Sequence, residues 1–102
     1  MKNQVKVGDI LYGMWHYTMH FPVWLRVTKV SEKTATAEEL CSIGGGQQGY
    51  EWPNPNRKMD NRKHVIRQNK EDGRLETGSW KNYDHYWLKK WDGKPIWADH
   101  MD

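Results

Sequence analysis

This sequence of 102 residues contains a single cysteine, Cys41. One cysteine excludes an internal disulfide and any zinc framework built on several cysteines. No run of 18 apolar residues occurs, and the N-terminal MKNQVKVGD lacks an apolar segment. We therefore expect neither a membrane span nor a signal peptide, and we predict a cytoplasmic protein without a membrane partner.

Aliphatic residues are also scarce, because only 36% of the chain is hydrophobic while seven residues are Trp. The length suits one domain, residues 1–102. A buried aromatic side chain removes about 150 to 250 Å² from water, so we expect a core built largely on tryptophan. The tryptophans expected to be structural are Trp15, Trp24, Trp87, Trp91 and Trp97. Trp52 and Trp80 are then the better candidates for exposure.

Short runs of β-branched and aromatic residues, separated by Gly, Pro, Asn and Asp, predict strands rather than helices. Alternation over Val23–Val30 predicts a half-buried strand with Val23, Leu25 and Val27 on one face, and Val30 breaks the phase, which indicates a bulge or an end. A turn at SEKT leads to TATAEEL, with Ala35 and Ala37 inward. The other predicted strands are Val5–Tyr12, which has a kink at Gly8 and Asp9 and ends at Gly13, then 63–68, 74–78, 87–91 and 96–98.

The segment 43–63, IGGGQQGYEWPNPNRKMDNRK, shows almost no periodicity. Pro53 and Pro55 each remove a backbone donor, which makes a helix improbable. We predict a long central loop here. At the other end of the chain, Asp92-Gly93 favours a hairpin whose flanking tryptophans cap the domain. Five to six short antiparallel strands then predict a small SH3-like barrel, or alternatively an OB-like one, because closure removes exposed strand edges.

Several motifs resemble, in order, a family of small uncharacterised proteins of bacteriophages and other bacterial mobile elements. They are VGDILY with a following Trp-x-Tyr, RVTKVSEKTATAEEL, NPN, KHVIR and WDGKPIWADHMD. The resemblance covers most of the chain, and WDGKP is its most distinctive part. It implies a phage or prophage origin and a compact β fold, and it implies no reaction.

No catalytic constellation is visible, so we expect no enzyme activity and no cofactor. Cys41 follows two glutamates, which would raise rather than lower the pKa of its thiol. The GGG at 44–46 lacks the Lys-Ser/Thr of a phosphate loop and is interpreted as a flexible connector. His16 and His20 could share a face with Asp99 and His100 near them, but a zinc site needs three or four converging ligands, so we expect no metal. His64 and His85 complete the set of histidines.

Basic and aromatic residues interleave in the second half of the chain, where eleven Lys or Arg face eight acids. Nucleic-acid-binding barrels stack bases on aromatic rings while Lys and Arg follow the backbone. The candidate binding residues are Tyr50, Trp52, Arg57, Lys58, Arg62, Lys63, Arg67, Trp80 and Tyr83.

Our leading hypothesis is a non-enzymatic, phage-encoded binding module. It would bind a host protein or ribonucleoprotein and could thereby inhibit host machinery or a host defence system such as CRISPR. Direct nucleic-acid binding is the alternative.

Overall fold

The computed structural model describes residues 1–16, 19–77 and 87–101. These residues form an antiparallel sheet of seven strands without any helix, so the prediction of a mainly β protein is confirmed. The strands are β1 (Ile10–His16), β2 (His20–Val30), β3 (Thr34–Gly44), β4 (Gln48–Gln68), β5 (Leu75–Thr77), β6 (Lys89–Lys90) and β7 (Ile96–Asp99). Over the same ranges there is no helix that could cross a membrane.

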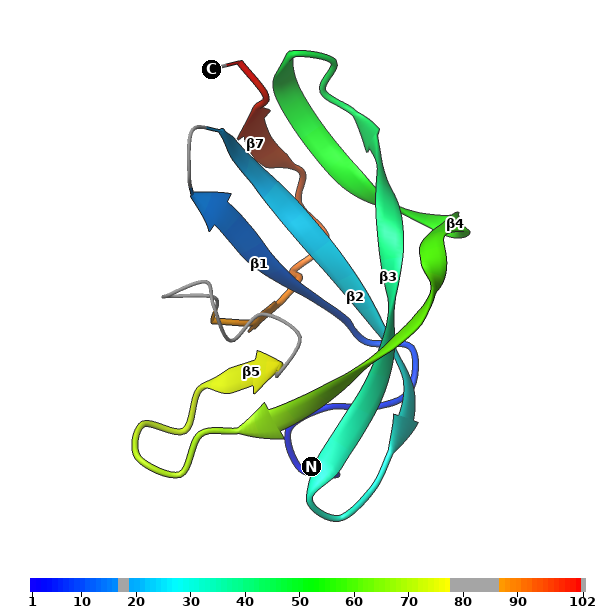
Figure 1. The fold of residues 1–102 in the computed structure, drawn as a ribbon, viewed down its shortest axis with the longest axis vertical. Helices are drawn as coiled ribbons and strands as arrows, with labels where there is room; N and C mark the ends of the chain where they lie inside the picture. The colour runs from blue at the N-terminus through cyan, green and yellow to red at the C-terminus, as the bar shows by residue number, and fades with distance from the viewer. Residues whose placement is uncertain (17–18, 78–86, 102) are drawn as a thin grey trace.

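The sheet curls into a partly closed ring at each end of the molecule (Figure 1). At one end, β2, β3, β4 and β7 pair in sequence, and β7 returns to β2 through His20 and Asp99. We call this the upper ring. At the other end, β1 to β5 form a meander, β6 pairs with β1, and one isolated bridge joins Leu75 to Leu88. We call this the lower ring. The 21-residue β4 runs the length of the molecule and belongs to both.

The β2 and β3 strands are buried on both faces, because one face of each strand lines the upper ring and the other face lines the lower ring. Successive side chains of a strand point to opposite faces, yet Trp24 and Leu25 are both about 99% buried, with exposures of 1% and 0%. Leu25 belongs to the main aliphatic cluster of the lower ring, and Trp24 does not. Trp24 pairs with Leu40 of β3, and its indole N–H donates to the Ser42 hydroxyl at 2.8 Å.

The expectation of a core built on tryptophan is wrong. The main cluster is aliphatic: Met1, Val5, Leu11, Leu25, Val27, Ala35, Ala37, Ile66 and Leu88. Only Trp24 among the predicted structural tryptophans is fully buried; Trp15, Trp87 and Trp91 are half-buried, and Trp97 is exposed. Trp24 lines the face of β2 opposite this cluster, where its ring meets that of Trp91 edge to face at 5.6 Å.

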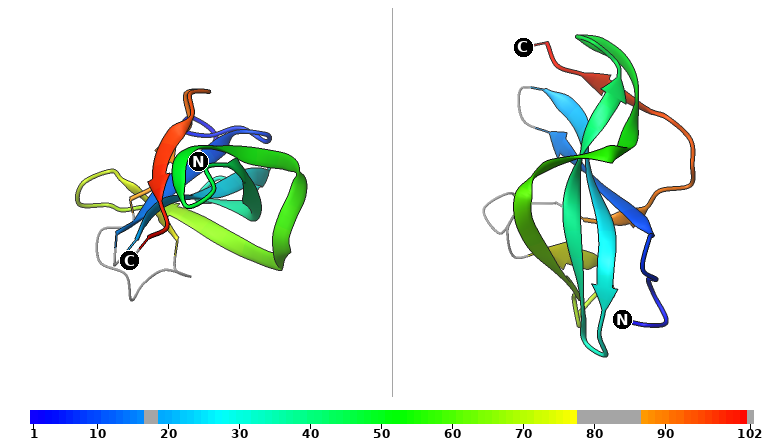
Figure 2. Two further views of the ribbon diagram at one scale, coloured as in Figure 1. Left: turned by 90° about the horizontal axis from the view of Figure 1, so that it is seen from above. Right: turned by 90° about the vertical axis from the view of Figure 1, so that its right-hand side faces the viewer.

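The predicted long loop over 43–63 is also wrong, because this segment is almost entirely strand. Residues 43–44 end β3, and β4 begins at Gln48. β4 bulges twice: residues 54–57 lie opposite Cys41 alone, and residues 59–62 lie opposite Glu39 alone. Pro55 lies inside the first bulge, and Pro53 is the last residue before it that keeps a register partner, Ser42. Each bulge has a local side-chain hydrogen bond, since Asn54 accepts from the amide of residue 56 and Asp60 from that of residue 62. Figure 2 shows the resulting angular path of β4.

The hairpin between β2 and β3 agrees with the sequence prediction. The Ser31 amide donates to the Thr34 carbonyl across the SEKT turn, and Ala35 and Ala37 are buried. The register shifts between Val27 and Lys29, which is the bulge that the phase break at Val30 indicated. The strand at 63–68 is confirmed as the end of β4, and the weaker strand after the KEDG turn is confirmed as β5.

Two other elements differ from the prediction. The first strand begins at Ile10 and continues through Gly13 to His16, while residues 2–8 form turns held partly by Val5 packing into the core. The predicted hairpin across Asp92-Gly93 does not form, because β6 pairs with β1 and β7 pairs with β4 and β2. The tight turn is nevertheless present: the Trp91 indole donates to the Lys94 carbonyl, and Asp92 accepts from the Lys94 amide.

Candidate functional site

Four large apolar side chains form a continuous exposed row on the outer face of the upper ring. Ile43 of β3 lies opposite Trp52 of β4, and Tyr50 lies opposite Trp97 of β7. Tyr50 and Trp52 are two residues apart and therefore share one face of β4. Their exposed fractions are 47% for Ile43, 41% for Trp52, 55% for Tyr50 and 53% for Trp97. We call these four residues the aromatic ladder.

The rings of the aromatic ladder are held in defined positions by the sheet. Tyr50 and Trp97 meet edge to face, with ring centroids 5.3 Å apart and planes at 80°, a geometry preferred by aromatic pairs. The Trp52 ring covers Gly44, since a Cβ at that glycine would lie 3.3 Å from the indole. The adjacent pair on this face is Gln48 and Asp99, whose side chains are joined by a 3.4 Å hydrogen bond. The ladder therefore presents a preformed surface with a polar border.

Sequence reasoning found only half of this surface. Tyr50 and Trp52 were candidate binding residues, and the structure places both on the surface. Trp97 was expected to be structural, but it points outward because its neighbour Ala98 occupies the inward position of β7. Ile43 was assigned to a loop. The register that joins these residues depends on strands far apart in the sequence, and no local pattern reveals it.

Four of the five described basic candidates lie in or beside the bulges of β4, and Arg67 lies near the end of the strand opposite Thr34. Arg57, Lys58, Arg62, Lys63 and Arg67 are all exposed. Acidic groups interrupt the cluster, because the Lys58 ammonium lies 3.8 Å from the Glu38 carboxylate and Asp60 lies within the second bulge. Arg26 approaches the first bulge, donating to the Pro55 carbonyl at 2.8 Å and to Glu38 at 2.6 Å. Trp80 and Tyr83 lie outside the described residues.

The inner face of the upper ring carries a buried acid. Glu51 is 3% exposed, and its Oε2 lies 2.5 Å from Nε2 of His100. The His100 ring stacks on Phe21 at 4.9 Å between centroids, and Phe21 stacks on Trp15 at 6.0 Å. The His100 amide also donates to the Gln47 carbonyl at 2.8 Å. His100 thus anchors the end of β7 to both β4 and β2.

Gly45 makes room for Glu51, so the GGG segment is a shaped turn rather than the flexible connector that we expected. All three glycines have positive φ, and a Cβ at Gly45 would lie 2.6 Å from both Cγ and Oε2 of Glu51. We expect G45A to lower the free energy of unfolding by about 2 kcal/mol more than G46A. Gly46 is the matched control, because its Cβ would meet nothing within 4 Å. Chemical denaturation of both variants measures the difference, and equal losses would contradict this account.

A second titratable pair, of buried His64 and half-buried Glu39, lies where β3 meets the lower half of β4. Nε2 of His64 lies 3.8 Å from the Glu39 carboxylate. Burial lowers the pKa of His64, against a raising effect of Asp60 and with a further lowering by Arg62. Burial and Asp60 raise the pKa of Glu39, and Arg62 opposes them. His64 is therefore uncharged at neutral pH, and this contact is not an ion pair.

The histidines do not assemble with other ligands in the part of the chain that the structure describes. There, no three His, Cys, Asp or Glu side chains converge in a way that could hold a metal ion. His20 and Asp99 are register partners, and His100 contacts Glu51 instead. His85 lies outside the described residues.

Comparison of the chain with protein-family models, with curated proteins and with solved structures gives no match in any of the three.

Proposed function

We propose that this protein is a non-enzymatic binding module that engages a partner protein through the aromatic ladder. The observation that carries the proposal is the exposure of Trp52, Tyr50 and Trp97 on paired strands. Aromatic residues are enriched among the energetically dominant contacts of protein interfaces. Single exposed apolar residues are common on protein surfaces, whereas a contiguous row of them marks an interaction site. The edge-to-face pair and the covered Gly44 fix these rings before binding, which lowers the entropy lost on association.

The chemistry of the surface favours a protein partner over a nucleic acid. Aliphatic Ile43 completes the row, and the adjacent pair on the same face contributes Gln48 and the acidic Asp99. A carboxylate beside the rings opposes an approaching phosphate backbone. The resemblance to phage proteins supports a bacterial host as the source of the partner, with an inhibitory role against host machinery or defence, such as a CRISPR system.

Direct nucleic-acid binding remains the second candidate, because five basic side chains are exposed along β4. It predicts a steep fall of affinity with salt, since bound phosphates release counterions. Charge reversal at four of these basic side chains would then abolish binding: Arg57, Lys58, Arg62 and Lys63. Glu38 and Asp60 weaken this candidate, because they lie among the cations that would contact the phosphates.

The architecture is further proposed to be an SH3-like barrel, with an OB-like barrel as the alternative. Support comes from the meander of β1 to β5, from the strong bending of β4, and from β6, which returns to β1.

The test of the proposed function is affinity capture from bacterial host lysate with the wild-type protein and with W97A. A captured protein should survive nuclease treatment, and its affinity for W97A should fall about thirtyfold, as expected for an interface hot spot. The matched control is V65A, because Val65 is a similarly exposed apolar residue on the lower half of β4. The proposal fails if W97A captures the same proteins as the wild type, or if nuclease releases everything that was captured.

A further inference from the structure

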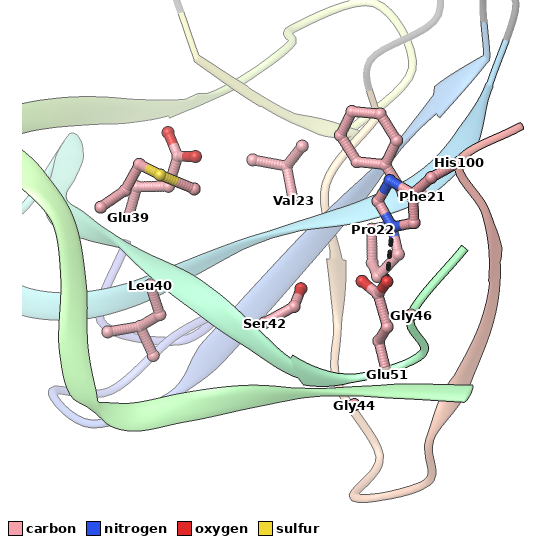
Figure 3. A pocket seen from close by; sticks show the side chains of 11 residues that line it. Phe21, Pro22, Val23, Glu39, Leu40, Ser42, Gly44, Gly46, Glu51 and His100 are labelled. Atoms are coloured by element: carbon pink, nitrogen blue, oxygen red, sulfur yellow. Dashed lines mark hydrogen bonds and ion pairs between the residues drawn. The ribbon is translucent and has the colours of Figure 1, made fainter. Parts of the chain in front are cut away.

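The upper ring surrounds a hollow on its inner face, opposite the aromatic ladder. The proposed partner binding through the ladder does not involve this hollow. The hollow measures about 320 Å³, which lies at the lower end of the sizes of small-molecule sites. Its wall combines apolar side chains with a few polar ones. The lining that matters here is Pro22, Val23, Leu40, Ser42, Glu51 and Met59. We call it the ring hollow (Figure 3).

Glu51 offers the ring hollow an acceptor that lacks a donor. Oε2 is satisfied by His100, but Oε1 is buried and has no hydrogen-bond partner among the described residues. Leaving a buried carboxylate oxygen without a donor is unfavourable, because the oxygen has lost its water and gained no hydrogen bond in exchange. Figure 3 shows the carboxylate directed from β4 toward Pro22 and His100. Glu51 is therefore a preplaced, incompletely satisfied anion on the wall of a partly apolar hollow.

We propose that the ring hollow binds an organic cation, namely an ammonium or guanidinium N–H donor carried on a short apolar stem. The head group lies at Glu51, where N–H donation to a carboxylate gives a strong, charge-assisted hydrogen bond. The stem packs along Pro22, Val23 and Leu40. Ser42 faces the same hollow, and its hydroxyl retains a second acceptor lone pair after receiving the Trp24 indole N–H.

The other charged groups determine which end of the ring hollow receives the head group. Glu39 also lines the hollow, and Figure 3 places it at the opposite end from Glu51. Arg62 opposes the rise in the pKa of the Glu39 carboxyl, so that end already has a cationic group. His100 is the basic group beside Glu51, and it contacts only Oε2. Two carboxylates disfavour an anionic ligand at either end.

The binding experiment follows the amide signals of Ser42, Gly46 and His100 by NMR during titration with butylammonium. We expect saturable shifts with a Kd on the order of 1 mM, as for a ligand of this size. 1-Butanol, which has the same stem without the charge, should give no saturable shift up to 50-fold higher concentration than half-saturation by butylammonium, on the order of 50 mM. E51Q should weaken binding about tenfold, because it removes the charge that assists the hydrogen bond.

Met59 provides variants that leave the buried wall intact, because its side chain is exposed at the lining. M59K should weaken binding about twofold, because its charge lies in the second bulge opposite Glu39 and repels the cation only from the far end of the hollow, whereas M59Q should not change it. E71Q, at an exposed glutamate on the β4–β5 turn, is the control for E51Q. If E51Q does not fold, the comparison of M59K with M59Q decides. The proposal is overturned by the absence of saturable shifts, by an equal response to 1-butanol, by unchanged binding to folded E51Q, or by equal binding to M59K and M59Q.

The same head group could belong to a free polyamine or to a side chain of a partner protein. Titration with 1,4-diaminobutane and with Nα-acetyl-lysine N-methylamide distinguishes these sources, since the tighter probe identifies the stem that the hollow fits. Saturable binding of either probe supports the proposal, and the absence of binding by both overturns it. W97A should bind these probes as the wild type does, so failure here and failure of the aromatic ladder are separate results.

Discussion

Replacement of Trp24 by alanine is expected to lower the free energy of unfolding by about 4 kcal/mol. The side chain is 1% exposed, so its loss leaves a cavity at the face that β2 shares with the upper ring. Three further contacts go with it: the hydrogen bond to Ser42, the edge-to-face contact with Trp91 and the tilted contact with Tyr12. Urea denaturation followed by circular dichroism measures the loss.

Two control variants make the Trp24 result specific. W24F keeps a large ring but removes the indole N–H, so it should cost less than W24A. W52A removes a tryptophan that is 41% exposed and should change the free energy of unfolding by no more than about 1 kcal/mol. Equal destabilisation by W24A and W52A would show that burial does not distinguish these residues.

Replacement of His100 by alanine is expected to cost about 3 kcal/mol, because it leaves the Glu51 carboxylate buried without its donor. When Glu51 is ionised, Nε2–H of His100 donates to Oε2. With Oε1 already lacking a partner, the variant would bury a charge with no hydrogen bond from the described residues. The variant also loses the ring that stacks on Phe21 and joins β7 to β2.

Two further variants, H100F and E51L/H100A, separate these contributions to the H100A effect. H100F preserves a ring against Phe21 and removes the donor, so it should lose most of the same free energy. E51L/H100A replaces the unpaired charge by an apolar side chain and should be more stable than H100A. If H100A unfolds at the same urea concentration as the wild type, the Glu51–His100 contact does not stabilise the closed upper ring.

The accuracy of the sequence predictions follows how local the determining contacts are. The β2–β3 hairpin, its bulge near Val27 and the β4–β5 turn were predicted because each depends on residues close in the sequence. The strand through 48–63 was missed, because Pro53 and Pro55 normally exclude a ladder position. Pro55 lies in the bulge opposite Cys41 and Pro53 lies at its edge, and the register that places them there joins residues about ten to thirty positions apart.

The direction in which the side chains of the aromatic ladder point was harder to predict than the strands that carry them. A strand of four residues such as β7 has too few alternations to fix its phase, so Trp97 was assigned inward although Ala98 takes that position. The error about the core has a related cause. β2 is buried on both faces, so its neighbouring residues Trp24 and Leu25 are both buried, each in a different interior. The composition of the sequence does not indicate that one strand lines two separate interiors.

The two bulges of β4 are also where this chain can change its length. Residues 54–57 and 59–62 face single residues of β3, whereas the segments on either side keep regular partners. An insertion or deletion inside a bulge would alter an exposed outline without shifting Tyr50 against Trp97 or Ile66 against Ala35. Related chains can therefore differ in size and sequence at this edge while both ends of the strand retain their pairing.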